Sequence, residues 1–135
     1  MVDEILKFTK ITFLLHLIVL LIFTILFWMP PVFATLFALT FDAISSALCQ
    51  MIAAIFTGAT AMNLFGYLAK EWKQGKIYVI FEIVWLPLGI ITVIINFAAY
   101  GISAILFLLV LIIFFVLFLI TFLQQEEIIG IIIGK

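Results

Sequence analysis

The sequence has little charge and no arginine. Only 10% of its 135 residues are Asp, Glu, Lys or Arg, and all six basic residues are lysines. Because the planar guanidinium group is absent, the chain cannot capture phosphate or carboxylate in the bidentate way that arginine does. The formal net charge of −1 also excludes the strongly basic surface that nucleic-acid binding requires, so we expect no nucleic-acid partner.

Metal ligands and catalytic groups are equally scarce. The chain contains one cysteine, Cys49, and one histidine, His16. A single cysteine forms no intrachain disulfide, and these two residues alone supply no zinc ligand set, so we expect no metal site. The sequence also lacks a glycine-rich phosphate loop and a pair of carboxylates at one depth. We therefore expect no cofactor and no enzymatic activity.

Apolar residues dominate what remains. They make up 69% of the chain, and the mean hydropathy is +1.54. A helix needs about 20 residues to cross a bilayer, so four crossings occupy most of the chain and leave no room for a soluble domain. The sequence therefore predicts an all-α, polytopic integral membrane protein. It would form a single membrane domain over residues 1–135, in contact with the lipid bilayer.

Prolines, charges and a glycine divide the apolar sequence into four spans. Pro30 and Pro31 end the first span, since proline lacks a backbone N–H and clashes with the preceding turn. Asp42 suits the N-cap of the second span, and Gly101 marks a tight turn after the third. The charged segment 70–76 predicts the remaining turn. The four predicted spans are residues 11–29, 43–69, 77–100 and 104–123.

The segment between the first two spans, residues 32–41, is apolar but too short to cross a membrane. It is expected to be a short interfacial helix or an extension of the second span, and a re-entrant segment is the less favoured alternative. A signal peptide competes for the first span, because Val32-Phe33-Ala34 resembles a cleavage site. The apolar run is longer than a typical signal core, which favours a membrane span.

The placement of lysine predicts the orientation. With four spans, the N-terminus, the 70–76 segment and the C-terminal tail share one side, and the other side carries only Asp42. By the positive-inside rule, we expect both termini in the cytoplasm. Aromatic residues support two interfaces, with Tyr67, Trp72 and Tyr78 on the inner side and Trp28 and Tyr100 on the outer side. The lysines on the inner side are Lys7, Lys10, Lys70, Lys73, Lys76 and Lys135.

The second span is rich in small residues. In lipid, such residues let helix backbones approach closely, so this span is expected to be the packed centre of the molecule and its assembly surface. A pore lining is the alternative. One helical face carries the candidate assembly residues Ala43, Ala47, Gln50, Ala54, Gly58 and Ala61. A neighbouring face carries Ser46, Cys49, Ala53, Thr60 and Asn63.

Three polar residues are predicted to lie at one depth. Counting about 1.5 Å per residue from the inner ends of their spans places His16, Asn63 and Glu82 roughly 8–10 Å deep. Intramembrane ionisable groups usually face a partner or a water cavity, so a contact between His16 and Glu82 is one interpretation. The simpler one is that Glu82 reaches the interface while His16 bonds a backbone carbonyl. The third span also carries Pro87 and a polar stripe from Glu82 to Asn96, which together would form a transport path.

The C-terminal tail, residues 128–135, is apolar and follows two acids. It is expected to lie on the interface, to extend the fourth helix, or to dock on another subunit. Together these features favour a non-enzymatic structural subunit of an oligomeric membrane assembly, in a cellular complex or a virion membrane of viral or archaeal origin. Its partners would be other copies of itself or other membrane subunits. The alternative function is a small channel or transporter that uses Glu82, Asn96 and His16.

Overall fold

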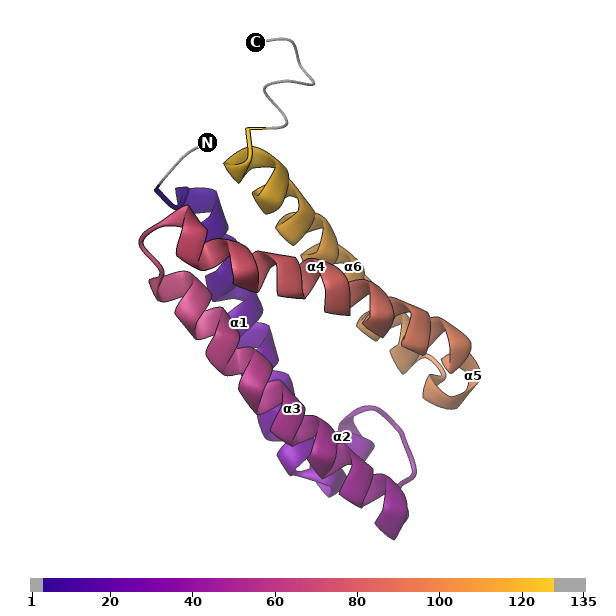
Figure 1. Cartoon of the computed structure of the whole chain (residues 1–135). Helices are drawn as coiled ribbons and strands as arrows, with labels where there is room; N and C mark the ends of the chain where they lie inside the picture. Colours follow the sequence, from indigo (N-terminus) through magenta and orange to yellow (C-terminus); the bar gives the residue numbers. More distant parts are fainter. Residues whose placement is uncertain (1–3, 128–135) are drawn as a thin grey trace.

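The computed structural model describes residues 4–127, and every regular element within them is a helix (Figure 1). Four of the helices are long and apolar enough to cross a membrane, which confirms the predicted four-span helical membrane protein. These are α1, α3, α4 and α6. The elements in order are α1 Lys7–Trp28, α2 Pro30–Leu36, α3 Ala43–Leu68, α4 Trp72–Ile95, α5 Phe97–Tyr100 and α6 Ser103–Gln125.

Local sequence signals set several of the helix ends as predicted. Helix α1 ends at Trp28, and Pro30 opens α2 at a position where its missing N–H needs no partner. The Asp42 carboxylate caps α3 by accepting a hydrogen bond from the Ser45 backbone N–H at 2.7 Å. Gly101 has a φ of +56°, the left-handed conformation that the turn before α6 requires. Of the short apolar segment 32–41, the part up to Leu36 belongs to the separate helix α2 and the rest is not helical, so the segment does not extend the second span.

The turn between the second and third spans is shorter than the predicted segment 70–76, because α4 already begins at Trp72. Tertiary contacts explain the earlier start. The Trp72 indole N–H donates a hydrogen bond to Glu126 at 2.6 Å, and the Lys76 ammonium lies 2.8 Å from the same carboxylate. Gly75 lies inside the helix, and its lack of a side chain leaves room for Ile5. An added Cβ at Gly75 would be 2.8 Å from the Ile5 side chain. The turn itself is confined to the few residues around Lys70.

The third span is also shorter than predicted at its far end. Helix α4 continues through Pro87 but ends at Ile95, and α5 follows after Asn96. The Asn96 side chain donates to the Thr92 carbonyl at 2.8 Å and so competes with the backbone hydrogen bonds of the helix. At the other end of the molecule, α1 and α6 each extend beyond the predicted spans. Gln125 causes this extension, because it binds the N-terminal segment through its side chain.

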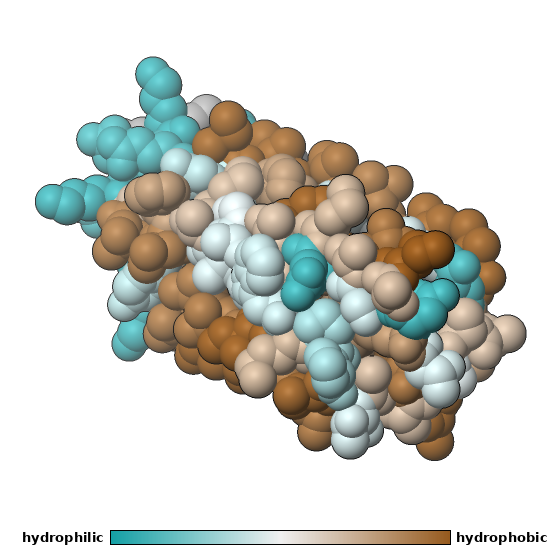
Figure 2. Space-filling model, turned by 90° about the horizontal axis from the view of Figure 1, so that it is seen from below, coloured by the Kyte–Doolittle hydropathy of each residue, from teal (hydrophilic) through white to brown (hydrophobic). Residues whose placement is uncertain are grey.

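Figure 1 shows two helix pairs, α1 with α3 and α4 with α6, that meet near the chain termini and diverge toward the opposite end. We call these the terminal end and the far end. The α3–α4 turn lies at the terminal end, beside the start of α1 and the end of α6. Figure 2 shows a group of hydrophilic side chains at one end of the face and a few more scattered over an otherwise largely apolar surface. At the terminal end the Gln125 Oε1 accepts hydrogen bonds from the Leu6 backbone N–H and the Thr9 hydroxyl at 2.8 and 3.1 Å.

Helix α3 does not lie at the centre of the molecule, so that prediction is wrong for packing within one chain. It packs along α1, and its contacts with α4 are fewer and reach from the terminal end to the Phe56 and Trp85 rings. The close approach to α1 occurs at Gly66, where an added Cβ would be 2.5 Å from the Phe13 ring. Only one of its two small faces is used in this contact, so the other remains on the surface.

Candidate functional site

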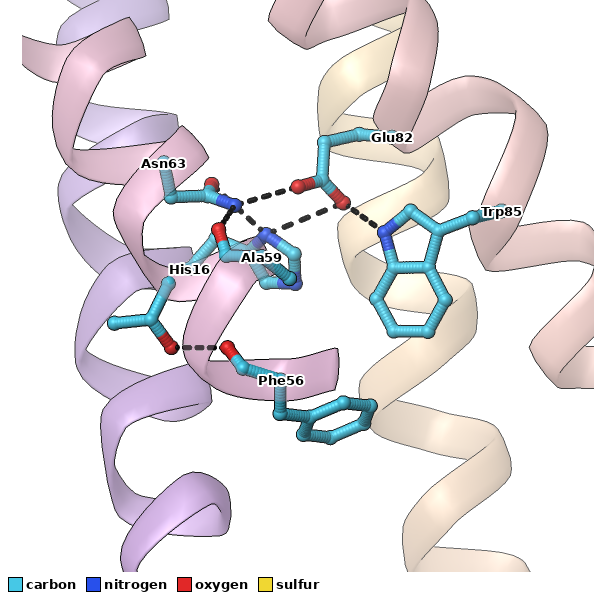
Figure 3. Close-up of polar contacts among 7 residues, drawn as sticks. His16, Phe56, Ala59, Asn63, Glu82 and Trp85 are labelled. Carbon is cyan, nitrogen blue, oxygen red and sulfur yellow. Dashed lines mark hydrogen bonds and ion pairs between the residues drawn. The ribbon is translucent and has the colours of Figure 1, made fainter. Parts of the chain in front are cut away.

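A polar cluster lies where the two helix pairs meet (Figure 3). It contains His16 from α1, Asn63 from α3, and Glu82 and Trp85 from α4. The exposed fractions of His16, Asn63 and Glu82 are 3%, 0% and 1%, so the group is removed from both lipid and water. The structure therefore brings together the three residues that the depth argument places in one layer.

Hydrogen bonds fix the direction of each group in the cluster. The Asn63 amide donates to the Glu82 carboxylate and to the Ala59 carbonyl, so its Oδ1 is left as an acceptor. His16 Nδ1 lies 3.1 Å from that oxygen and 3.5 Å from Glu82 Oε2, and must therefore carry a hydrogen. The Trp85 indole N–H donates to Glu82 as well. The carboxylate is thus surrounded by donors from three helices.

Helix α6 completes the surroundings of the cluster with aromatic rings and contributes no charge. The His16 ring lies 4.4 Å from the Phe114 ring centre and 5.2 Å from that of Phe118. Glu82 does not extend to the interface, and His16 bonds a side chain and not a backbone carbonyl, so both parts of the simpler interpretation are wrong. Removing either His16 or Glu82 would leave a buried charge or hydrogen-bond donor without its partner, which is strongly unfavourable in a low-dielectric interior.

Asn96, the second residue of the predicted transport path, is not part of this site. It lies fourteen residues after Glu82, about 21 Å further along the helix direction, is exposed, and bonds its own helix at Thr92. The structure therefore does not join Glu82 and Asn96. Cys49 is buried with its thiol 3.5 Å from the Phe27 carbonyl, as expected of a packing residue.

Next to the polar cluster, a crevice of about 600 Å³ extends between the helix pairs. Its lining is almost entirely apolar and rich in aromatic rings, and His16 and Trp85 contribute to it near the cluster. On one side the rings of Phe23, Phe33 and Phe37 all contact Phe107 of α6, which closes that wall. The sequence did not reveal this feature. Its only trace there is the number of phenylalanines, 16, without a spacing that assigns them to one cavity.

The small-residue face of α3 lies on the opposite side of that helix from the crevice. All six candidate assembly residues are exposed, and an added Cβ at Gly58 would have nothing within 4 Å. The neighbouring face turns inward, where Cys49, Ala53 and Asn63 are buried. We call the exposed set the α3 stripe; it consists of Ala43, Ala47, Gln50, Ala54, Gly58 and Ala61.

Within residues 4–127, no group of three His, Cys, Asp or Glu side chains is arranged to hold a metal ion. The predicted apolar tail, residues 128–135, lies outside the described residues. Fold and site together define a small, four-span helical membrane protein with a buried polar cluster of His16, Asn63 and Glu82 between its two helix pairs. Comparison with protein-family models, with curated proteins and with solved structures finds no match to this chain.

Proposed function

We propose that this chain is a non-enzymatic subunit of an oligomeric membrane assembly whose copies meet along the α3 stripe. The observation that carries the proposal is the exposure of that stripe on a helix whose other small face already packs closely, with Gly66 against the Phe13 ring. The chain uses one small face of α3 for its own packing. The second face offers the same kind of surface to a neighbour.

Association in lipid depends on close packing. Lipid tails are as apolar as leucine, so a bulky helix face gains little by leaving them, whereas small residues allow extended van der Waals contact between backbones. Ala54 and Gly58 stand one turn apart on the stripe, and the space beside Gly58 is open. A second helix placed there would gain contacts that a lipid chain supplies less well.

Gln50 supports the same surface. It is exposed on α3, about 10 Å from the start of the helix, and its side chain has no hydrogen-bond partner among residues 4–127. An amide without a partner is unfavourable in hydrocarbon. Because an amide both donates and accepts, two Gln50 side chains related by a two-fold axis would satisfy each other.

The orientation belongs to the same proposal. Five lysines, namely Lys7, Lys10, Lys70, Lys73 and Lys76, lie at the terminal end among the described residues, whereas the far end carries Asp42. By the positive-inside rule, this distribution favours a cytoplasmic terminal end. A subunit partner would then meet α3 within the bilayer.

The test measures the copy number of stripe variants in mild detergent by size exclusion with light scattering. Ala54→Leu and Gly58→Leu place bulky side chains on the stripe and should reduce the copy number while the helical circular dichroism is unchanged. Ala98→Leu is the matched control, because Ala98 is an exposed alanine outside the stripe. The proposal is wrong if the wild type is monomeric, or if the stripe variants keep the copy number of the wild type.

A second candidate function, proton or cation transport, is favoured by the His16–Glu82 contact beside the crevice. If this pair carries a proton or a cation, proteoliposomes should show flux that Glu82→Gln abolishes without loss of folding. A purely structural Glu82 predicts no flux in the wild type. Dye measurements of pH and ion concentration in liposomes separate the two functions.

A further inference from the structure

The crevice differs in chemistry along its length, and its polar groups are few. Most of those along its walls are already bonded within the chain. The Thr92 hydroxyl donates to the Leu88 carbonyl, and the Ser45 hydroxyl donates to Asp42. His16, at the end of the crevice beside the polar cluster, keeps a ring nitrogen free, because only its Nδ1 is engaged by the cluster.

The second ring nitrogen of His16 is available to a ligand. His16 Nε2 has no hydrogen-bond partner among residues 4–127, and Figure 3 shows it turned away from Asn63 and Glu82. Within that range, no side-chain nitrogen or oxygen is both fully enclosed and unbonded, so this atom is reached from the crevice that His16 lines. Since Nδ1 carries the hydrogen, Nε2 of the neutral imidazole is an acceptor. The residue itself is only 3% exposed.

The charge behind this acceptor is negative. Glu82 is the charged group in the cluster, while α3 contributes the neutral Asn63 and α6 contributes Phe114 and Phe118. The described lysines all belong to the terminal end. Because Glu82 is the acidic group of the cluster and no described lysine lies beside it, the dry surroundings favour a nearby cation far more strongly than water would. An anion would be repelled.

The rest of the crevice suits an apolar, aromatic body. Its volume of about 600 Å³ lies within the range of roughly 300–1,000 Å³ that is typical of small-molecule sites. The Phe56 and Trp85 rings, 5.7 Å apart, form part of its wall beside the polar end. Ile52 and Leu88 line the crevice and are also exposed, at 41% and 59%, so it opens between α3 and α4 toward the lipid. A ligand would enter from the bilayer.

We propose that this crevice binds an amphiphilic amine, with its ammonium N–H donating to His16 Nε2, on the side of the imidazole opposite Glu82, and its aromatic or aliphatic body along the ring-lined wall. The ammonium is balanced by the Glu82 charge, and the aromatic rings add cation–π attraction. This site goes beyond the proposed assembly function. It uses the crevice face of α3, whereas assembly uses the stripe on the opposite face, so the two can fail separately.

The test compares three probes that share one body and differ in the head group: phenylbutylamine, phenylbutanol and phenylbutyrate. Saturable binding is measured by equilibrium dialysis against the full chain in phosphatidylcholine nanodiscs at pH 7, with empty nanodiscs subtracted. The amine is expected to bind at least tenfold more tightly than the alcohol, and the acid is expected to show no saturable binding. If all three bind alike, the crevice holds a lipid-like chain and the proposal is overturned, as it is if the amine does not bind saturably.

Two kinds of variant locate the site. Ile52→Trp narrows the crevice and should weaken amine binding at least tenfold, while Ile55→Trp, on the same helix but outside the crevice and 69% exposed, should bind as the wild type does. Glu82→Gln removes the charge and keeps a side chain of the same shape. It should abolish the preference for the amine over the alcohol. Unchanged binding in Ile52→Trp, or an unchanged preference in Glu82→Gln, would contradict the assignment.

Discussion

Two glycines of α3 show how differently its two faces are used. An added Cβ at Gly66 would lie 2.5 Å from the Phe13 ring, and one at Gly58 would have nothing within 4 Å. Phe13 is itself fully buried, so its ring has no free direction in which to move. The first glycine is required by packing within the chain, and the second is not.

We predict that Gly66→Ala destabilises the fold by about 1–3 kcal/mol, the usual cost of overpacking. Gly58→Ala should instead leave the stability unchanged or raise it by up to about 1 kcal/mol, because alanine favours a helix more than glycine does. Unfolding in mixed detergent–SDS micelles, followed by circular dichroism, measures both. Equal effects of the two variants would show that Phe13 does not pack against Gly66 as described.

Asn63 and Asn96 form a similar pair of asparagines. Asn63→Leu removes the amide that joins His16 to Glu82 and leaves both buried groups short of a partner, at a cost of about 1–3 kcal/mol. Asn96→Leu is the control and should change stability by less than about 0.5 kcal/mol, because its side chain is exposed. The same unfolding measurement applies. A neutral Asn63→Leu would mean that the polar cluster contributes little to the fold.

The layer of His16, Asn63 and Glu82 follows from the sequence because helical rise converts residue number into depth. The sequence does not indicate which small face of α3 turns inward, because Ala53 and Ala54 are equally small. The fit of Phe13 against Gly66 places the Ala53 face toward the interior. The free Nε2 of His16 is also invisible in the sequence. It depends on the direction of the Asn63 amide.

At the scale of the elements, the terminal end of α4 is tied to α6 by one carboxylate. Hydrogen bonds from Lys76 and then from Trp72 lower the pKa of Glu126 below its ordinary value of 4.5. The lowered pKa means that the ionised form stabilises the folded state. This contribution is complete above the ordinary pKa and is lost as the pH falls through the lower folded-state value.

We therefore predict that the unfolding midpoint of the wild type falls on acidification below about pH 4.5 and that Glu126→Gln removes part of this fall. Glu71→Gln is the matched control, because Glu71 is an exposed glutamate at the same end of the molecule. Its pH dependence should equal that of the wild type. If Glu126→Gln also retains the full pH dependence, then the contact with Lys76 and Trp72 does not stabilise the fold.

Helix ends differ in how far they can be read from sequence. Pro30, Asp42 and Gly101 act through their own backbone or the next turn, so they are recognisable locally. The start of α4 depends on Trp72 and its partner fifty-four residues later, which no local pattern contains. Charges near residue 70 are therefore consistent with a turn or with a helix surface, and tertiary contacts decide between them.

At the scale of the whole molecule, the four spans place the α3–α4 turn and the α2 segment on opposite sides of a membrane. In a Cys49→Ser background, single cysteines at Gln74 and Thr35 should react with a membrane-impermeant maleimide from opposite sides. Both positions are exposed, so access is not limited by packing. Labelling of both from the same side would contradict the four-span topology, and labelling of Gln74 from the outside would reverse the proposed orientation.

The divergence of the two helix pairs has a consequence for the membrane itself. Because the helix pairs meet at the terminal end and separate toward the far end, a chain embedded in a bilayer would occupy more area in one leaflet than in the other. Lipids around such a wedge pack with least strain when the leaflet at the far end is the expanded one. The chain should therefore concentrate in curved membrane whose convex side is the leaflet at the far end. Several copies in one assembly would add their individual effects and increase the curvature.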